Sequence, residues 1–494
     1  MEDNASTRPR LTTGRRNVLV TAAVAGIGAL IASQVASSAR TSTAPLTDDV
    51  KLQHLLRRTG FGASASELDQ YRKLGLNGTV ERLLNYETVD NSALETRLNR
   101  ANFDLSKPLP LEMWWLLRMA YTARPFEEKL TLFWHGLLTS AISKVGRAEL
   151  MFQQNQFFRQ NAMGRFPDIL KGVSRDPAMM IWLDLNSNRK GHPNENYARE
   201  LMELFSLGVG NYSEQDVRES ARAFTGWTLR AQRFFYDKRF HDDGQKTFLA
   251  HTGNFNGNDI IDIIVQQPAS AKFITNKLFS FFVYPNPTDQ VLQPFVQTYV
   301  TSSYSIKALV QKLLTSDEFY SPRAYRALIK SPTEYLVGII RGLGLEADGV
   351  GLPQVMNLMG QMLFNPPNVA GWPGGPAWLT TGTWLARLNT ANRVTTALTG
   401  AAPNPFARPN PKAPIQPFDV SSFFKGVTAP AQAVDHVLGL LVDGNVDPAQ
   451  RQVLIDYVTP PNGTSLANAN RVWLAERARG LFYLTLALPE FHLS

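Results

Sequence analysis

Residues that could do chemistry gather most densely between His192 and His251. An acidic helix is predicted near the start of this stretch and a His-Asp-Asp-Gly loop near its end. The candidate catalytic residues are Glu195, Arg199, Glu200, Glu203 and His241, and the candidate metal ligands are His241, Asp242, Asp243 and His251. Imidazole and carboxylate ligands together suit zinc, manganese or calcium. A divalent metal ion here would activate water for hydrolysis, with a spare carboxylate as general base.

The same residues also have a structural interpretation. The stretch contains no established ligand signature such as His-Glu-x-x-His. On a solvated helix face, the pairs that Arg199 forms with Glu195 and Glu203 contribute only a few tenths of a kcal/mol each. Asp242-Asp243-Gly244 is also typical of a turn. A metal site therefore requires His241, Asp243 and a glutamate from 195–203 to converge within ligand distance.

One further histidine, His135, is a candidate metal ligand outside the central stretch. It follows Trp134 on a predicted helix whose apolar stripe is Phe126, Leu130, Phe133 and Leu137. The interpretation that we favour for His135 is a hydrogen-bonded structural histidine, and the alternative is a ligand role.

Helical periodicity positions the acidic side chains of the central stretch. At about 100° per residue, Glu195, Arg199 and Glu203 fall on one arc of a helix that Asn194 caps. The opposite arc is apolar, and Gly208 and Gly210 provide a stop. A second helix is predicted over 213–224, opened by a variant of the capping box. A small irregular or hairpin insert is expected between Trp227 and Phe248.

Aromatic side chains in that insert support a second hypothesis of a different class. They are Trp227, Phe234, Phe235, Tyr236 and Phe240. Such rings stack on sugars or form the centre of a protein interface, although most aromatic residues serve core packing. A non-catalytic envelope protein that binds a polysaccharide or a protein partner predicts exposed rings on a concave surface, with the acids far apart.

The N-terminal segment predicts export. Arg15-Arg16 precede an apolar run and then small residues up to Ala39, so residues 1–39 resemble a twin-arginine signal peptide. Its partner is the twin-arginine translocation machinery, which carries proteins already folded. The protein is thus expected in the periplasm, at the cell surface or outside the cell. It would contact a membrane only through an uncleaved signal.

Composition excludes several classes of function. The chain has no cysteine, which removes disulfides, thiolate nucleophiles and cysteine-ligated metal sites. The formal net charge is +8, and residues 1–39 hold four arginines against two acids, which leaves +6 on the rest. The cations are scattered, so no nucleic-acid partner is expected. The fingerprints of serine hydrolases, dinucleotide binders and P-loops are absent as well. Noncovalent haem through His135 or His241 stays open.

The pattern predicts an all-α protein, a multi-helical globular array with long ordered loops and at most a small β-hairpin insert. Residues 40–46 form a tether, and 47–400 form the main helical domain. Six prolines make 401–417 an extended linker or surface excursion. Residues 418–494 are expected to form a C-terminal helical part that packs on the main domain.

Motifs distributed along the chain resemble the DUF1800 family of exported bacterial proteins of unknown function. They are Leu55-Leu56-Arg57-Arg58-Thr59-Gly60-Phe61-Gly62, Phe133-Trp134-His135, residues 194–203, residues 241–248 and Pro366-Pro367-Asn368-Val369-Ala370-Gly371-Trp372. The resemblance covers about residues 50–490. It implies a mainly helical exported protein, often encoded beside sulfatase-like DUF1501 proteins, and no established reaction. The chain departs from the family pattern at Gly136-Leu137-Leu138, where the family tends towards Asn-His-Phe, which weakens a metal site on that helix.

Overall fold

The structure is a computed structural model that describes residues 46–398, 404–407, 426–461 and 465–494. This part of the chain contains 21 α-helices and two small antiparallel sheets, which confirms the all-α prediction. The signal at 1–39, nearly all of the tether and most of the proline-rich segment lie outside the described residues. None of the helices in the described ranges has the length and apolar composition needed to cross a membrane.

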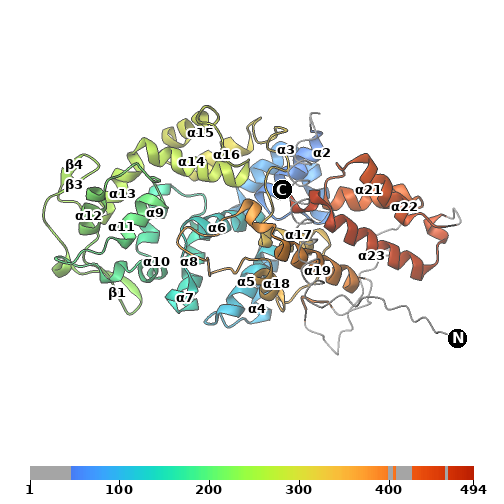
Figure 1. Ribbon diagram of the computed structural model, residues 1–494, viewed down its shortest axis with the longest axis horizontal. Coiled ribbons are helices and arrows are strands. Elements are labelled where there is room, and N and C mark those ends of the chain that lie inside the picture. Colours follow the sequence, from blue (N-terminus) through green and yellow to red (C-terminus); the bar gives the residue numbers. More distant parts are fainter. Residues whose placement is uncertain (1–45, 399–403, 408–425, 462–464) are drawn as a thin grey trace, which may run out of the picture.

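Helices follow one another along the chain (Figure 1), most of them joined by short connections and some by long loops such as 315–331 and 359–380. Those before the first strand are α2 (Asp48–Thr59), α3 (Ala65–Leu84), α4 (Ser92–Ala101), α5 (Pro108–Tyr121), α6 (Pro125–Leu137), α7 (Ile142–Val145), α8 (Ala148–Gln160), α9 (Phe166–Ser174), α10 (Pro177–Trp182), α11 (Asn196–Glu203) and α12 (Glu214–Ala223). Those after the last strand are α13 (Gly257–Gln266), α14 (Pro268–Phe282), α15 (Asp289–Thr301), α16 (Ile306–Leu314), α17 (Pro332–Gly342), α18 (Leu352–Leu358), α19 (Thr381–Leu398), α21 (Pro430–Leu441), α22 (Pro448–Val458) and α23 (Arg471–Ala487).

The strands form two hairpins where one was expected. β1 (Trp227–Arg230) pairs with β2 (Arg233–Tyr236), and β3 (Lys246–Phe248) pairs with β4 (His251–Gly253). Each turn consists of two residues, Ala231-Gln232 and Leu249-Ala250, and all four have positive φ. Tight hairpin turns require this backbone, but the usual Asn-Gly signal is missing from both. The second hairpin therefore left no turn signal in the sequence.

The apolar core of the described residues consists of two large clusters that meet at α6 and a small third cluster between α2 and α3. One cluster is built mainly from α6, α9 and α11–α16, and the other from α4, α5, α17–α19 and α21–α23. Figure 1 shows the hairpins at one end of the molecule and α21–α23 at the other, with α6 between them. Within the proline-rich segment, the described residues 404–407 pack on the second cluster through the buried Phe406.

The last residues of the chain return to the centre of the molecule. Lys330 donates its backbone N–H to the carbonyl of His492 at 2.9 Å, and Ser494 donates to Leu328 at 2.8 Å. This short antiparallel pairing places the end of the chain against the segment that leads into α17. The C-terminal helices thus share a core with α5 and α17.

Helix α6 is buried on nearly every side. Pro125 opens it, and Glu127 and Glu128 lie in the first turn, where the helix dipole favours carboxylates. The predicted stripe of Phe126, Leu130, Phe133 and Leu137 is buried, and so are the charged residues between its members. The charged side chains must therefore find partners inside the protein.

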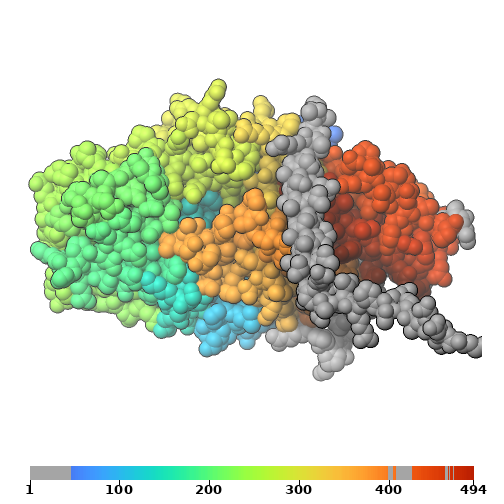
Figure 2. All heavy atoms as spheres, in the orientation of Figure 1, coloured from blue at the N-terminus to red at the C-terminus, as the bar shows by residue number. Residues whose placement is uncertain are grey.

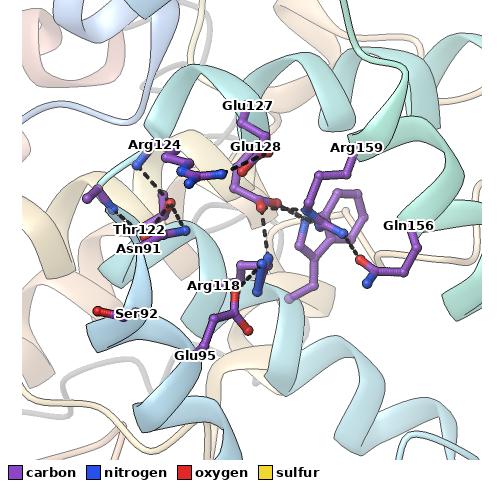
Figure 3. A network of polar contacts seen from close by, with 12 residues as sticks. Asn91, Ser92, Glu95, Arg118, Thr122, Arg124, Glu127, Glu128, Gln156 and Arg159 are labelled. Atoms are coloured by element: carbon purple, nitrogen blue, oxygen red, sulfur yellow. Dashed lines mark hydrogen bonds and ion pairs between the residues drawn. The ribbon is translucent and has the colours of Figure 1, made fainter. Parts of the chain in front are cut away.

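Glu128, which is fully buried, lies at the centre of a polar network (Figure 3). Its carboxylate accepts hydrogen bonds from Arg118 Nε of α5 at 3.0 Å and from Arg159 Nε and Nη2 of α8 at 2.7 and 2.9 Å. The indole of Trp115 donates a further bond at 2.9 Å. Burial alone would raise the pKa of Glu128, but the two arginines hold it below its ordinary value.

Replacing Glu128 by glutamine is expected to reduce the free energy of unfolding by about 3–5 kcal/mol, because the buried Arg159 would lose its counter-charge and Arg118 would lose the buried one of its two carboxylate partners. Urea unfolding followed by circular dichroism measures the change. The control is Glu95→Gln, which removes the half-exposed partner of Arg118 and should cost no more than about 1 kcal/mol. Equal losses in the two variants would contradict this account of α6.

Candidate functional site

The acidic helix forms close to where it was predicted. α11 begins at Asn196, with Asn194 accepting a hydrogen bond from the Asn196 backbone at 3.0 Å and Glu195 in the cap position. The helix buries the predicted apolar arc, which includes Tyr197, Leu201 and Met202. Its polar arc faces away from the core.

Charged residues on α11 pair with their near neighbours. Arg199 contacts Glu195 at 3.3 Å and Glu214, the first residue of α12, at 2.7 Å. Glu203 accepts a hydrogen bond from the Tyr212 hydroxyl at 2.8 Å. Partial burial, aided by the Glu203 charge, raises the pKa of Glu200. These contacts tie α11 to the start of α12.

The His-Asp loop packs on the other end of α12. His241 is 4% exposed, and its Nδ1 lies 2.8 Å from the carbonyl of Thr225. Asp242 pairs with Arg222, near the end of α12, at 2.8 Å. Lys246 is buried and donates to the carbonyls of Asp242 and Gly244 at 2.5 and 3.0 Å. Internal partners thus hold the loop in a defined conformation.

The structure does not bring the acidic helix and the His-Asp loop together. Glu214, which contacts α11, and Arg222, which contacts the loop, are separated by about 12 Å of helix α12. Asp243 is exposed in the loop. His251 is also exposed, but it follows the Leu249-Ala250 turn, where Leu249 donates its backbone N–H to Asp216 near the start of α12 at 2.7 Å. Among the residues that the structure describes, no group of three or more histidines and acids could hold a metal ion.

His135 lies on α6, where the two core clusters meet. Its Nε2 accepts a hydrogen bond from the Phe364 backbone at 3.0 Å. The rings of Trp115, Phe364 and Trp372 surround it at 5.1–5.6 Å between centroids. Burial lowers the pKa of His135 to about 3. This is the environment of a neutral, hydrogen-bonded histidine.

A surface of cations and aromatic rings lies around the first hairpin. We call it the basic hairpin surface and define it by the exposed cations Arg189, Lys190, Arg230, Arg233, Lys238 and Arg239 and by the rings of Phe235, Tyr236 and Phe240. Tyr236 and Phe240 are 40% and 38% exposed. By contrast, the predicted contact residue Trp227 is buried and packs edge-on against Phe224 and Phe234.

Backbone and ring contacts join the two parts of this surface. Lys190 donates its backbone N–H to the carbonyl of Phe240 at 2.8 Å. The guanidinium of Arg189 lies 4.7 Å from the centre of the Phe240 ring, and that of Arg230 lies 3.5 Å from the Phe235 ring. Two segments that are 40 residues apart in the sequence therefore present one continuous surface.

These two segments, 189–190 and 230–240, contain six cations and a single carboxylate. That carboxylate, Asp237, is enclosed by Arg239 at 2.7 Å and Arg230 at 3.0 Å, and the hydrogen bond from Arg239 lowers its pKa. Within the described ranges, Lys190, Arg233 and Lys238 have no acidic partner within 4.0 Å. The surface therefore keeps a net positive charge that is available to a ligand.

The fold and this geometry define a mainly helical protein with a cationic, aromatic surface at one end. Residues 54–493 match the family model described as "Protein of unknown function (DUF1800)", and the chain belongs to this family. No curated protein and no solved structure matches it.

Sequence reasoning identified the rings of the hairpin but missed its cations. In the sequence they occur as one pair at 189–190 and as single residues and pairs between 230 and 239, which do not form a basic run. The alternation of arginine and aromatic residues from Leu229 to Phe240 was the available signal.

The ion pair between Asp242 and Arg222 makes the stability of the folded protein depend on pH. The hydrogen bond from Arg222 lowers the pKa of Asp242 from 3.8 to about 2. Because the folded pKa is depressed, the pair contributes its full stability above pH ~4 and loses it as the pH falls towards 2. The wild-type protein should thus lose more stability over this interval than Asp242→Asn in chemical unfolding. Asp243→Asn, at the exposed neighbour, is the control, and identical profiles for wild type and Asp242→Asn would contradict the assignment.

Proposed function

We propose that this protein is an exported, non-catalytic protein of the cell envelope that binds an acidic polysaccharide through the basic hairpin surface. The observation that carries the proposal is that six exposed cations and the exposed rings of Tyr236 and Phe240 lie together around the first hairpin. The twin-arginine-type signal of the sequence supports the envelope as the place of action.

The chemistry of the surface suits a polymer that carries both sugar rings and negative charges. Exposed faces of Tyr236 and Phe240 offer flat apolar area on which the C–H side of a sugar stacks. Lys190, Arg233 and Lys238 offer cations for carboxylate or phosphate groups along the polymer. A long ligand would engage several of these groups at once, which compensates for weak individual contacts.

Partners in the export route follow from the same proposal. The signal would bring the folded protein to the twin-arginine translocation machinery. A DUF1501-type exported protein is proposed as a further partner, on the basis of the family resemblance alone.

The alternative function, a metal-dependent hydrolase at His241, has its own test. The described histidines and acids do not gather into a ligand group, so the geometry gives this function less support than polymer binding. Elemental analysis of residues 40–494, produced through the native export route, decides between them. Stoichiometric metal that is lost in His241→Ala would support the hydrolase.

Polymer binding is tested with polygalacturonate, whose uronate units combine a sugar ring with a carboxylate. The double variant Arg233→Gln, Lys238→Gln is expected to bind about tenfold more weakly or worse in calorimetric titration, since each lost cation contributes about 1 kcal/mol at an anionic surface. Wild-type affinity should also fall as the ionic strength rises.

The matched control is the double variant Arg100→Gln, Lys312→Gln, which removes two exposed cations far from the hairpin. Dextran is the uncharged control polymer. Equal affinity of the two double variants, or binding of dextran as tight as that of polygalacturonate, would overturn the proposal.

A further inference from the structure

A cavity of about 380 Å³ lies at the centre of the molecule, where the two core clusters meet. We call it the central cavity. Its walls come from α6, from α14, from the start of α17 and from the loop 361–378. In Figure 2, teal atoms are recessed between yellow-green and orange surfaces, the colours of α6, α14 and this loop. The cavity is therefore open to solvent on this face.

Docking of the loop against the end of α6 builds one wall of the cavity. Thr139, just after α6, donates its hydroxyl to the carbonyl of Val369 at 2.6 Å. Gly371 has a φ of 82°, and a Cβ there would lie 2.5 Å from the carbonyl oxygen of Gly136. Only glycine permits this close approach. The result is a fixed loop that places Trp372 and Trp378 in the cavity wall.

The lining combines aromatic rings with a few polar groups. Phe133 and Phe281 lie in the wall together with the two tryptophans. Ser280, Ser331 and Gln361 add polar groups. Natural small-molecule sites have this composition and occupy about 300–1,000 Å³. The volume of the central cavity falls in that range.

One carboxylate in the wall, Glu334, has a fixed charge. It pairs with the buried Lys129 of α6, and the backbone N–H of Ser331 donates to it at 2.7 Å. Burial acts to raise the pKa of Glu334, but Lys129 and Ser331 hold it below its ordinary value. This side chain is an ionised hydrogen-bond acceptor at the inner, buried side of the cavity.

The cation in the wall, Lys277 of α14, has no such partner. Among the described residues no acid lies within 4.0 Å of its ammonium group, which lies 5.2 Å from the centre of the Phe273 ring. Lys277 is exposed, which places it at the solvent side of the cavity. An anionic group of a ligand would find its counter-charge there.

We infer that the central cavity binds a small organic anion that carries a flat ring. The ring packs among Trp372, Trp378 and Phe281, and the anionic group pairs with Lys277. A hydroxyl or amine of the same ligand donates to Glu334. The site is separate from the basic hairpin surface and does not depend on the proposed function.

Gly136 provides a direct way to close the cavity. It lies in the wall, and a Cβ added there would meet no atom within 4 Å. Phe133 and Leu137 on the same helix make this part of the wall apolar. A leucine side chain at 136 would extend into the free space. The substitution also favours the helix, because leucine has a higher helix propensity than glycine.

The probe is 1-anilinonaphthalene-8-sulfonate, an aromatic sulfonate whose fluorescence rises in apolar sites. We expect one saturable site on the native protein of residues 40–494. Gly136→Leu should abolish it, and Lys277→Gln should weaken it about tenfold, the equivalent of one lost ion pair of about 1.4 kcal/mol. Thermal unfolding establishes that each variant is folded.

Two matched controls accompany these variants. Gly439→Leu makes the same change in α21, where an added Cβ also meets nothing within 4 Å, and Lys272→Gln removes a cation five residues before Lys277 on α14. Both should bind the probe like the wild type. Absence of a saturable site, or binding that neither Gly136→Leu nor Lys277→Gln changes, would overturn the inference. If Gly136→Leu fails to fold, the result for Lys277→Gln decides alone, because that residue is exposed.

Discussion

The compensation of charge along the buried helix α6 is the constraint on which the rest of the structure depends. A buried carboxylate without partners costs several kcal/mol, so Glu128 requires cations that are held in fixed positions. Arg118 of α5 and Arg159 of α8 meet this requirement. The side chain of the next residue, Lys129, points towards α17 and pairs with Glu334. The adjacent charges of Glu128 and Lys129 thus fix α5, α8 and α17 in position around α6.

The C-terminal end of α6 forms part of the wall of the central cavity. His135 holds the backbone of Phe364, and the carbonyl of Gly136 lies against Gly371. The central cavity therefore has walls whose positions are set by buried charges and by close backbone contact. Such preorganised walls favour selective binding, since little ordering is needed when a ligand enters.

The basic hairpin surface has a different physical character. It lies at one end of the molecule, on a two-stranded sheet and a short connecting segment (Figure 1). Its cations are long exposed side chains, which adapt to a ligand at an entropic cost. This suits recognition of a repetitive charged polymer, whereas the central cavity suits a small molecule of defined shape.

The sequence predicted what depends on local pattern. The apolar stripe of α6, the buried arc of α11 and the capping box that opens α12 all occur as expected. It did not predict that Glu128 is buried, because the partner arginines lie on other helices. The second hairpin was missed because Leu249-Ala250 lacks the residues that usually mark a left-handed turn.

The candidate site of the acidic helix and the His-Asp loop also shows that the sequence predicts local elements but not the contacts between them. Both elements form locally, but they contact opposite ends of α12, and no spacing along the chain encodes this separation. The basic hairpin surface is the converse case. Two of its cations precede the other four by about 40 residues in the sequence, and the contacts of Arg189 and Lys190 with Phe240 bring the two groups together.

Hydrogen–deuterium exchange of the mature protein, with and without polygalacturonate, tests the central claim most directly. Polymer binding at the basic hairpin surface should slow the exchange of amides in 189–192 and 227–241 and leave those around α11 and the central cavity unchanged. Unchanged exchange in the hairpin, with protection confined to another region, would contradict the account.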